Sequence, residues 1–284
     1  MTGRAHGAAL VLVLWLVALL TALVGAYALS GRVEHIQGRA IARGVVAEQA
    51  ARAGLEYGMS RMTDPDPQLA WLPDGRPYPF RIGDAEVVVR VVDESGKVDL
   101  NAAEQPLLVA LLQGAGAESG DASAVAGAII DWRDGDTLTQ AGGGAEDADY
   151  AAAGRPYGAK DAPFETVAEV EQVLGMTPAL FAAIEPHLTV FSGQPQPDQR
   201  FAAGAVLQAL GVDPSQVVAA REAGGTPADA ALVGGGSGTY SIDSRARLSD
   251  GRIAVLRAVV RAGASGVPGS AYTPLRWEEG ATPR

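Results

Sequence analysis

The sequence predicts an α+β protein in which a long N-terminal helix packs on a small antiparallel sheet and a large all-α domain is inserted between strands. First, an uncharged N-terminal run continues into a helical pattern, and no proline occurs before Pro65. Second, two groups of β-branched segments lie far apart, and a region rich in Ala, Gly and Leu with helical spacing separates them. Each strand group alone would be a marginal sheet, so we expect the two groups to pair.

The N-terminal helix is expected over residues 8–62. The stretch from Gly7 to Leu29 carries no charge and is long enough to cross the ~30 Å hydrocarbon core of a bilayer. Apolar residues then recur every three or four positions up to Met62, with charged residues between them. Arg4 before the run favours a cytoplasmic N-terminus, with the bulk of the chain outside the cytoplasm. A secretory signal cut near residues 25–28 is the competing interpretation, but its apolar core would usually be ~7–15 residues.

Composition narrows the classes of function. The chain has 284 residues, 48% of them hydrophobic, and a formal net charge of −11. An acidic protein is a poor partner for nucleic acid, because phosphate binding needs clustered Lys and Arg. Cysteine is absent, which excludes disulfides, thiolate catalysis and thiolate metal sites.

The sheet is expected in two parts, over residues 63–100 and 237–262. Residues 69–79 are typical of a turn-rich connector. Strands at 80–82, 85–92 and 97–100 would then form a three-stranded meander, and strands at 239–247 and 253–260 would complete the sheet. The tail over residues 263–284 is rich in Gly, Pro, Ser and Thr, and we expect it to be disordered.

The inserted helical domain is expected over residues 101–236. Asn101 would cap its first helix, which Gly114 or Gly116 would end. Thr177-Pro178 and Asp213-Pro214 each supply a cap and a first-turn proline after a glycine turn, as in helix-hairpin-helix units. A weak repeat at an offset of one hundred residues also links the sequences after positions 101 and 201. Such hairpins can bind nucleic acid, but acidic residues flank these glycine turns, so packing or protein contact is the preferred interpretation.

The acidic residues gather in one loop of the insertion. Residues 131–136 and 146–150 hold six carboxylates and flank a glycine-rich segment. Carboxylates held together repel one another unless a cation or solvent relieves them, and hard oxygen ligands suit Ca²⁺. A solvated acidic loop is the simpler alternative. A carboxylate pair for hydrolysis is a third, but the three histidines, His6, His35 and His187, lie elsewhere in the sequence.

Several stretches together resemble the K-class minor pseudopilins of type II secretion systems. They are the Gly7-Ala8 junction, the segment DESGKVDLNAAEQPLLVALL over residues 93–112, the run from Trp132 to Gly193, and the C-terminal strand pair. The resemblance extends from residue 7 to about residue 262. It implies a pilin-like fold with a large helical insertion and a structural role rather than an enzymatic one.

The resemblance also implies a processing pathway. Residues 1–7 would be a leader that prepilin peptidase removes after Gly7, with methylation of the new N-terminal residue, Ala8. The mature protein would be a single-pass inner-membrane protein with a cytoplasmic N-terminus and a periplasmic bulk. Other pilins carry a glutamate at the fifth mature position, where this chain has Leu12; K-class members typically lack that acid, which suits a subunit with no pilin above it.

The partners implied are the I- and J-class minor pseudopilins, other pseudopilins, prepilin peptidase, the inner-membrane secretion platform and membrane lipid, with no nucleic acid. With them the protein would form the tip of the periplasmic pseudopilus, prime its assembly and support export of folded proteins across the outer membrane. Family members bind calcium in the loop that corresponds to residues 131–149. The best ligand candidates there are Asp134, Asp136, Glu146, Asp147 and Asp149. The alternatives are a membrane-anchored helix-hairpin-helix protein that binds nucleic acid and a secreted enzyme with a Ca²⁺-stabilised loop.

Overall fold

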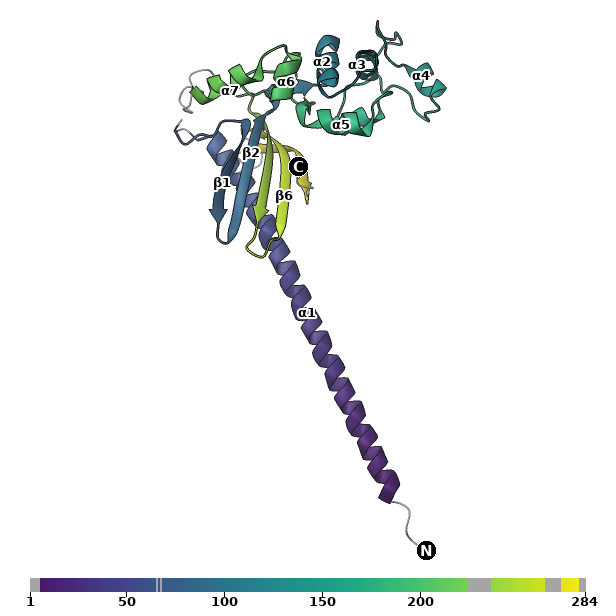
Figure 1. Cartoon of the computed structure of the whole chain (residues 1–284), viewed down its shortest axis with the longest axis vertical. Coiled ribbons are helices and arrows are strands. Elements are labelled where there is room, and N and C mark those ends of the chain that lie inside the picture. The colour runs from purple at the N-terminus through teal and green to yellow at the C-terminus, as the bar shows by residue number, and fades with distance from the viewer. Residues whose placement is uncertain (1–5, 65, 67, 224–235, 264–271, 281–284) are drawn as a thin grey trace.

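Three parts follow one another along the long axis of the molecule (Figure 1). The structure is a computed structural model that describes all residues except 1–5, 65, 67, 224–235, 264–271 and 281–284. Helix α1 extends away from the body of the protein, a sheet lies along its C-terminal part, and a helical domain sits at the end of the sheet that is far from the N-terminus. The predicted α+β class, with helices inserted between strands, is confirmed.

Helix α1 (His6–Met62) is continuous over 57 residues. Its stretch Ala9–Tyr27 has a mean hydropathy of 2.7 and is 0% buried, and it is the one helix among the described residues that is long and apolar enough to cross a membrane. The 19 residues of this stretch span ~28 Å, close to the thickness of a hydrocarbon core. The C-terminal part of α1 is one-sided instead, because Ala51, Leu55 and Met59 are at most 2% exposed where they face the sheet.

The sheet has five antiparallel strands in the order β1-β2-β5-β6-β7. The strands are β1 (Asp74–Ile82), β2 (Ala85–Asp93), β5 (Thr239–Arg247), β6 (Ile253–Ala262) and β7 (Tyr272–Glu279). Burial alternates along β2 and so identifies the face of the sheet that packs on α1. Val87, Val89 and Val91 are fully buried on that face, while the residues between them are partly or fully exposed. Burying one such valine contributes about 1.5–3 kcal/mol. The two strand groups therefore pair as expected, with β2 beside β5.

Two features fix α1 against this sheet. Gly54 permits close approach, since a Cβ there would lie 2.3 Å from Ser244 Oγ and 2.7 Å from Val87 Cγ1. Nearer the N-terminus of α1, Arg43 pairs with Asp84 (2.7 Å) and Asp250 (3.2 Å). These two acids lie in the turns after β1 and β5. The hydrogen bond from Arg43 lowers the pKa of Asp84. Exposed ion pairs contribute little stability, so the main contribution of Arg43 is to link α1 to these two turns.

The first strand begins earlier than the sequence predicted. Residues 69–79 were expected to be a connector, but β1 starts at Asp74 and contains Pro77 and Pro79. An edge strand tolerates proline because its outward side needs no N–H donor. The expected meander is also wrong in its third strand. Of these residues only Val98–Asp99 forms a strand (β3), and it pairs in parallel with β4 (Leu188–Thr189) inside the helical domain.

The expectation of a disordered tail over residues 263–284 is wrong for its central part. Residues Tyr272–Glu279 form β7, which pairs with β6, while 264–271 and 281–284 lie outside the described residues. Trp277 packs against the sheet core, and the Arg52 guanidinium lies 5.6 Å from its ring centroid. Composition alone misses this strand, because its stability comes from pairing with β6 and from contacts with α1 rather than from local propensity.

The helical domain has a hydrophobic core of its own. Its elements are α2 (Gln105–Gly114), α3 (Ser119–Arg133), α4 (Asp147–Ala152), α5 (Pro178–Ile184), α6 (Gly204–Ala209) and α7 (Pro214–Ala223), with the short 3-10 helices η1 (Glu94–Gly96), η2 (Val167–Gln172) and η3 (Glu185–His187). Leu108, Leu112, Ile129 and Leu207 are at most 1% exposed in a cluster that contains no residue of the five-stranded sheet. The predicted cap at Thr177 is confirmed: its hydroxyl accepts from Leu180 N at 3.2 Å.

The weak sequence repeat corresponds to two similar helical hairpins. Helices α2 and α3 are joined through Gly116, and α6 and α7 through Gly211, both glycines having positive φ (100° and 73°). Arg133 at the end of α3 donates to the carbonyls of Leu100 and Ala103, in the turn before α2. In the second copy, an arginine at the end of α7, Arg221, donates to carbonyls of Gln199 and Ala202, in the turn before α6.

Asn101 does not cap α2 as predicted. The N-cap residue is Glu104, and Asn101 instead exchanges two hydrogen bonds with the backbone of Phe164, at 2.9 Å and 2.7 Å. Pro106 in the first turn of α2 explains the later helix start. Asn101 therefore joins two loops of the domain that are distant in sequence.

A buried polar network joins the helical domain to the sheet. Glu94 is 1% exposed and accepts from Lys97 Nζ at 2.6 Å, and Lys97 also donates to Ser241 Oγ on β5 at 2.6 Å. The hydroxyls of Ser241 and of Thr189 on β4 donate to the same carboxylate. One side chain thus collects donors from the sheet, the connecting turn and the helical domain.

Candidate metal centre

The candidate centre lies where a glycine-rich loop folds back onto α3. Helix α3 carries Gly127 at the contact, where a Cβ would lie 1.7 Å from the carbonyl oxygen of Gly143. A Cβ on Gly144 would lie 2.1 Å from Asp131 Oδ2. Any other residue at either position would push the loop away. The glycines therefore bring the start of α4 against the end of α3.

Three carboxylates meet at this contact. Asp131 lies in the last turn of α3, Asp134 is the residue that ends α3, and Glu146 is the N-cap of α4. One oxygen from each lies within 4.8 Å of the other two. Oxygens bound to a Ca²⁺ ion at 2.3–2.6 Å can be at most about 5 Å apart, so the three can share one such ion.

The oxygens of the cluster differ in their hydrogen bonds. Asp131 accepts from the backbone N–H groups of Ala145 (2.7 Å) and Gln140 (3.2 Å). Asp134 Oδ1 and Glu146 Oε1 are buried and have no hydrogen-bond partner among the described residues. Glu146 as a whole is only 8% exposed. Buried polar atoms are nearly always satisfied in folded proteins, so these two adjacent oxygens are available to a cation or to water.

The carboxyl groups of the cluster have raised pKa values. Burial, and then the charges of Asp131 and Asp134, raise the pKa of Glu146 to about 7. Burial also raises the pKa of Asp134 and of Asp131. Asp161, which has a positive φ of 53°, adds a further negative charge near Glu146 and Asp134. Without a cation the cluster therefore binds a proton near neutral pH, and a divalent cation would favour the ionised form.

The structure brings together two of the five predicted ligands, Asp134 and Glu146. The other three have structural partners instead. Asp136 is exposed and accepts from Leu138 N (2.8 Å), Asp147 accepts from Ala159 N (3.1 Å), and Asp149 accepts from Glu146 N (3.0 Å).

Asp131 is the member of the cluster that the prediction left out. It follows the buried residues Ala128 and Ile129 on α3 and precedes the buried Trp132. An acid inside an apolar helical run was the available signal, since charged residues are seldom fully buried unless they are paired or bind a metal.

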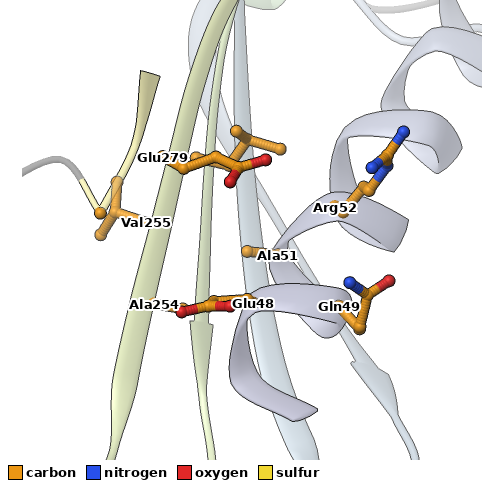
Figure 2. Close-up of a pocket in the computed structure, with 9 residues that line it drawn as sticks. Glu48, Gln49, Ala51, Arg52, Ala254, Val255 and Glu279 are labelled. Carbon is orange, nitrogen blue, oxygen red and sulfur yellow. The ribbon is translucent and has the colours of Figure 1, made fainter. Parts of the chain in front are cut away.

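Away from the carboxylate cluster, a hollow lies between α1 and the strands β6 and β7 (Figure 2). Glu48, Gln49 and Arg52 line it from α1, and Ala254 and Glu279 from the sheet side. The described residues of its lining include no histidine, serine or threonine. Its charged groups are the carboxylates of Glu48 and Glu279 and the guanidinium of Arg52.

Comparisons with known proteins agree with this architecture. Residues 88–193, from β2 to the turn after β4, match the family described as type II secretion system (T2SS), protein K. No curated protein sequence matches the chain. Among solved structures, it is similar to a chain in the crystal structure of the GspK-GspI-GspJ complex from the enterotoxigenic Escherichia coli type 2 secretion system. The TM-score is 0.57 at 17% identity, over 88% of this chain and 99% of that chain.

Proposed function

Since residues 88–193 match the family described as type II secretion system protein K, we propose that this chain belongs to that family and acts as the minor pseudopilin at the tip of the periplasmic pseudopilus. In this role it assembles with the I- and J-class minor pseudopilins, primes the fibre and supports export of folded proteins. The similar chain from Escherichia coli occurs in a complex of GspK, GspI and GspJ. The function is structural, and its further contacts are with other pseudopilins, the inner-membrane secretion platform and membrane lipid.

The single observation that carries the tip assignment is the position of the helical domain. It lies at the end of the sheet opposite to the end from which α1 extends (Figure 1). In a fibre of parallel α1 helices, this end points away from the membrane and toward the place of the next subunit. A folded domain there blocks that place. Leu12 supports the same role, since a carboxylate in hydrocarbon is costly unless a cation from a neighbour pairs with it.

The tip assignment predicts the behaviour of a chain without the helical domain. Asp93 on β2 and Tyr240 on β5 are register partners, so replacing residues 94–239 with Asn-Gly would join the strands as a hairpin. We expect this variant to insert in the membrane and to occur along the fibre. The full-length protein should occur only at the tip of the fibre. Immunogold labelling of fibres measures the difference. Labelling of the variant at the tip alone would contradict the proposal.

Processing at the N-terminus is the second part of the proposal. Gly7 and Ala8 fall in the first turn of α1, and the apolar stretch Ala9–Tyr27 follows at once. Cleavage after Gly7 would leave Ala8 as a methylated N-terminal residue and a single-pass anchor in the inner membrane.

Intact mass of the membrane-extracted protein tests this processing. We expect a chain that begins at Ala8 in cells with prepilin peptidase and the uncut chain in cells without it. A chain beginning near Ser30 in both strains would indicate an ordinary secretory signal instead and would remove the pseudopilin assignment.

Calcium binding is the third part of the proposal. Asp131, Asp134 and Glu146 would hold the ion, and the two unsatisfied buried oxygens support this. Carbonyl groups of the glycine-rich loop and water would complete the six to eight oxygen ligands that Ca²⁺ takes. The ion would tie the end of α3 to the start of α4 and so order the loop between them.

A further inference from the structure

The face of the sheet that points away from α1 is rich in arginine. Residues on each strand alternate between the two faces, and those that alternate with the buried valines of β2 point outward. Register then assigns six arginines of β2, β5, β6 and β7 to the outer face: Arg90, Arg245, Arg247, Arg257, Arg261 and Arg276. Figure 1 shows this face of the sheet with no described helix packed over it.

Four of these arginines have no acidic partner in the part of the chain that the structure describes. Arg257 pairs with Asp243 at 2.7 Å, and Arg276 pairs with Glu278. Arg90, Arg245, Arg247 and Arg261 are exposed and form no ion pair. The outer face therefore carries unpaired positive charge from three adjacent strands.

This charge contrasts with the rest of the protein. The chain has a net charge of −11, and its helical region from Asn101 to Ala223 holds 17 acidic residues against five Lys and Arg. A general excess of arginine thus does not explain the outer face. Apolar side chains lie between the arginines: Val255 and Val259, on the same face, are 4% and 7% exposed. Arginine is among the residue types that are enriched at protein interfaces.

We propose that the outer face of the sheet is a docking surface for a carboxylate-rich segment of a partner protein. Guanidinium groups form paired hydrogen bonds with carboxylates, and arginines two residues apart on a strand stand ~7 Å from each other. Five strands of about nine residues cover roughly 600 Å², which approaches the ~800 Å² per partner of a standard interface. The inference goes beyond the proposed function and does not depend on it.

Two other anionic partners fit less well. A membrane surface is out of reach, because α1 rises ~24 Å between Tyr27 and Arg43 at the near end of the sheet, about three Debye lengths at physiological salt. Nucleic acid would meet the acids Glu86, Asp243 and Glu278 within the face and the strongly acidic helical domain beyond it. Glu86, Asp243 and Glu278 repel an acidic protein segment as well, but a short segment can lie within the face and so avoid the acidic helical domain.

The test uses the full-length protein in detergent micelles and a fluorescent 20-residue polyglutamate as the probe. We expect saturable binding at low salt that Arg245→Glu/Arg247→Glu weakens about tenfold. The matched control is Arg39→Glu/Arg155→Glu, which makes the same charge change at two exposed arginines away from the sheet and should change affinity less than twofold. Both double variants should keep the wild-type circular dichroism spectrum.

Four results would overturn the proposal. Equal weakening by both double variants would show general charge attraction, and no measurable binding would remove the surface altogether. Tighter binding of a 20-nucleotide oligothymidine than of polyglutamate would assign the face to nucleic acid. Self-association of the wild type, abolished in Arg245→Glu/Arg247→Glu on sedimentation, would make a second copy of this chain the occupant.

Discussion

Replacing Glu146 with glutamine should weaken calcium binding about 100-fold or more, because calcium affinity follows the number of charged ligands. The same change should stabilise the calcium-free protein at neutral pH. Glu146 is 8% exposed and lies beside two other acids, so its charge is costly in the absence of a cation. Glutamine keeps the size of the side chain and removes that charge. One substitution thus has opposite effects in calcium and in chelator.

The pH dependence follows from the same side chain. The pKa of Glu146 is raised from 4.5 to about 7 in the calcium-free fold, so the folded protein holds a proton that the unfolded chain releases. Stability in chelator should therefore fall as pH rises from about 4.5 to about 7. Saturating calcium should remove this loss, because the ion favours the ionised carboxylate. In the Glu146→Gln protein this contribution to the pH dependence should be absent.

Urea unfolding followed by tryptophan fluorescence measures these effects, since Trp132 packs beside the site and is 4% exposed. Calcium at 100 times its dissociation constant should stabilise the wild type by ~2.7 kcal/mol and the variant by much less. Glu165→Gln is the matched control, because the side chain of Glu165 is 83% exposed. If Glu146→Gln kept its response to calcium, or if Glu165→Gln lost it, the three-carboxylate centre would be wrong.

Local pattern in the sequence was sufficient for much of this fold. A run of apolar residues without proline predicts α1, and alternation of β-branched residues predicts β2, β5 and β6, because these signals depend on near neighbours. Strand β7 could not be predicted in this way. Its residues Pro274, Arg276 and Glu278 do not favour a strand by themselves, and β6 supplies the pairing.

The candidate site was predictable as a region but not as a set of ligands. An acidic loop rich in glycine indicates a cation site, yet six carboxylates there compete for the role. Hydrogen bonds from the backbone distinguish between them. Asp147 accepts from Ala159 N and Asp136 accepts from Leu138 N, and the spacing of the acids in the sequence predicts neither bond. The arginine face is similar, since only the strand register places Arg90 beside residues of β5 that follow it by about 150 positions.

The largest loss of stability should come from Lys97→Met, at the junction of the two domains. The side chain of Glu94 is 1% exposed, and Lys97 is its only cationic partner among the described residues. Methionine has a similar length but leaves the carboxylate buried without a countercharge. Removing one member of a buried ion pair typically costs about 3–5 kcal/mol. We therefore expect destabilisation of that size, and less for Glu94→Gln, because the lysine is 13% exposed and can turn toward water.

The double variant Lys97→Met/Glu94→Gln separates the charge from the packing. Glutamine can still accept from the hydroxyls of Ser241 and Thr189, and no buried charge remains. The double variant should therefore be more stable than Lys97→Met alone. Trp132 reports on the helical domain, and Trp71 and Trp277 pack against the sheet core. Single-tryptophan versions, with the other tryptophans replaced by phenylalanine, therefore follow each part separately in urea. In the wild type the two transitions should coincide, and in Lys97→Met they should part, because Glu94 collects donors from both domains. Coincident transitions in Lys97→Met, or a double variant as unstable as the sum of the single ones, would show that the network does not couple the domains.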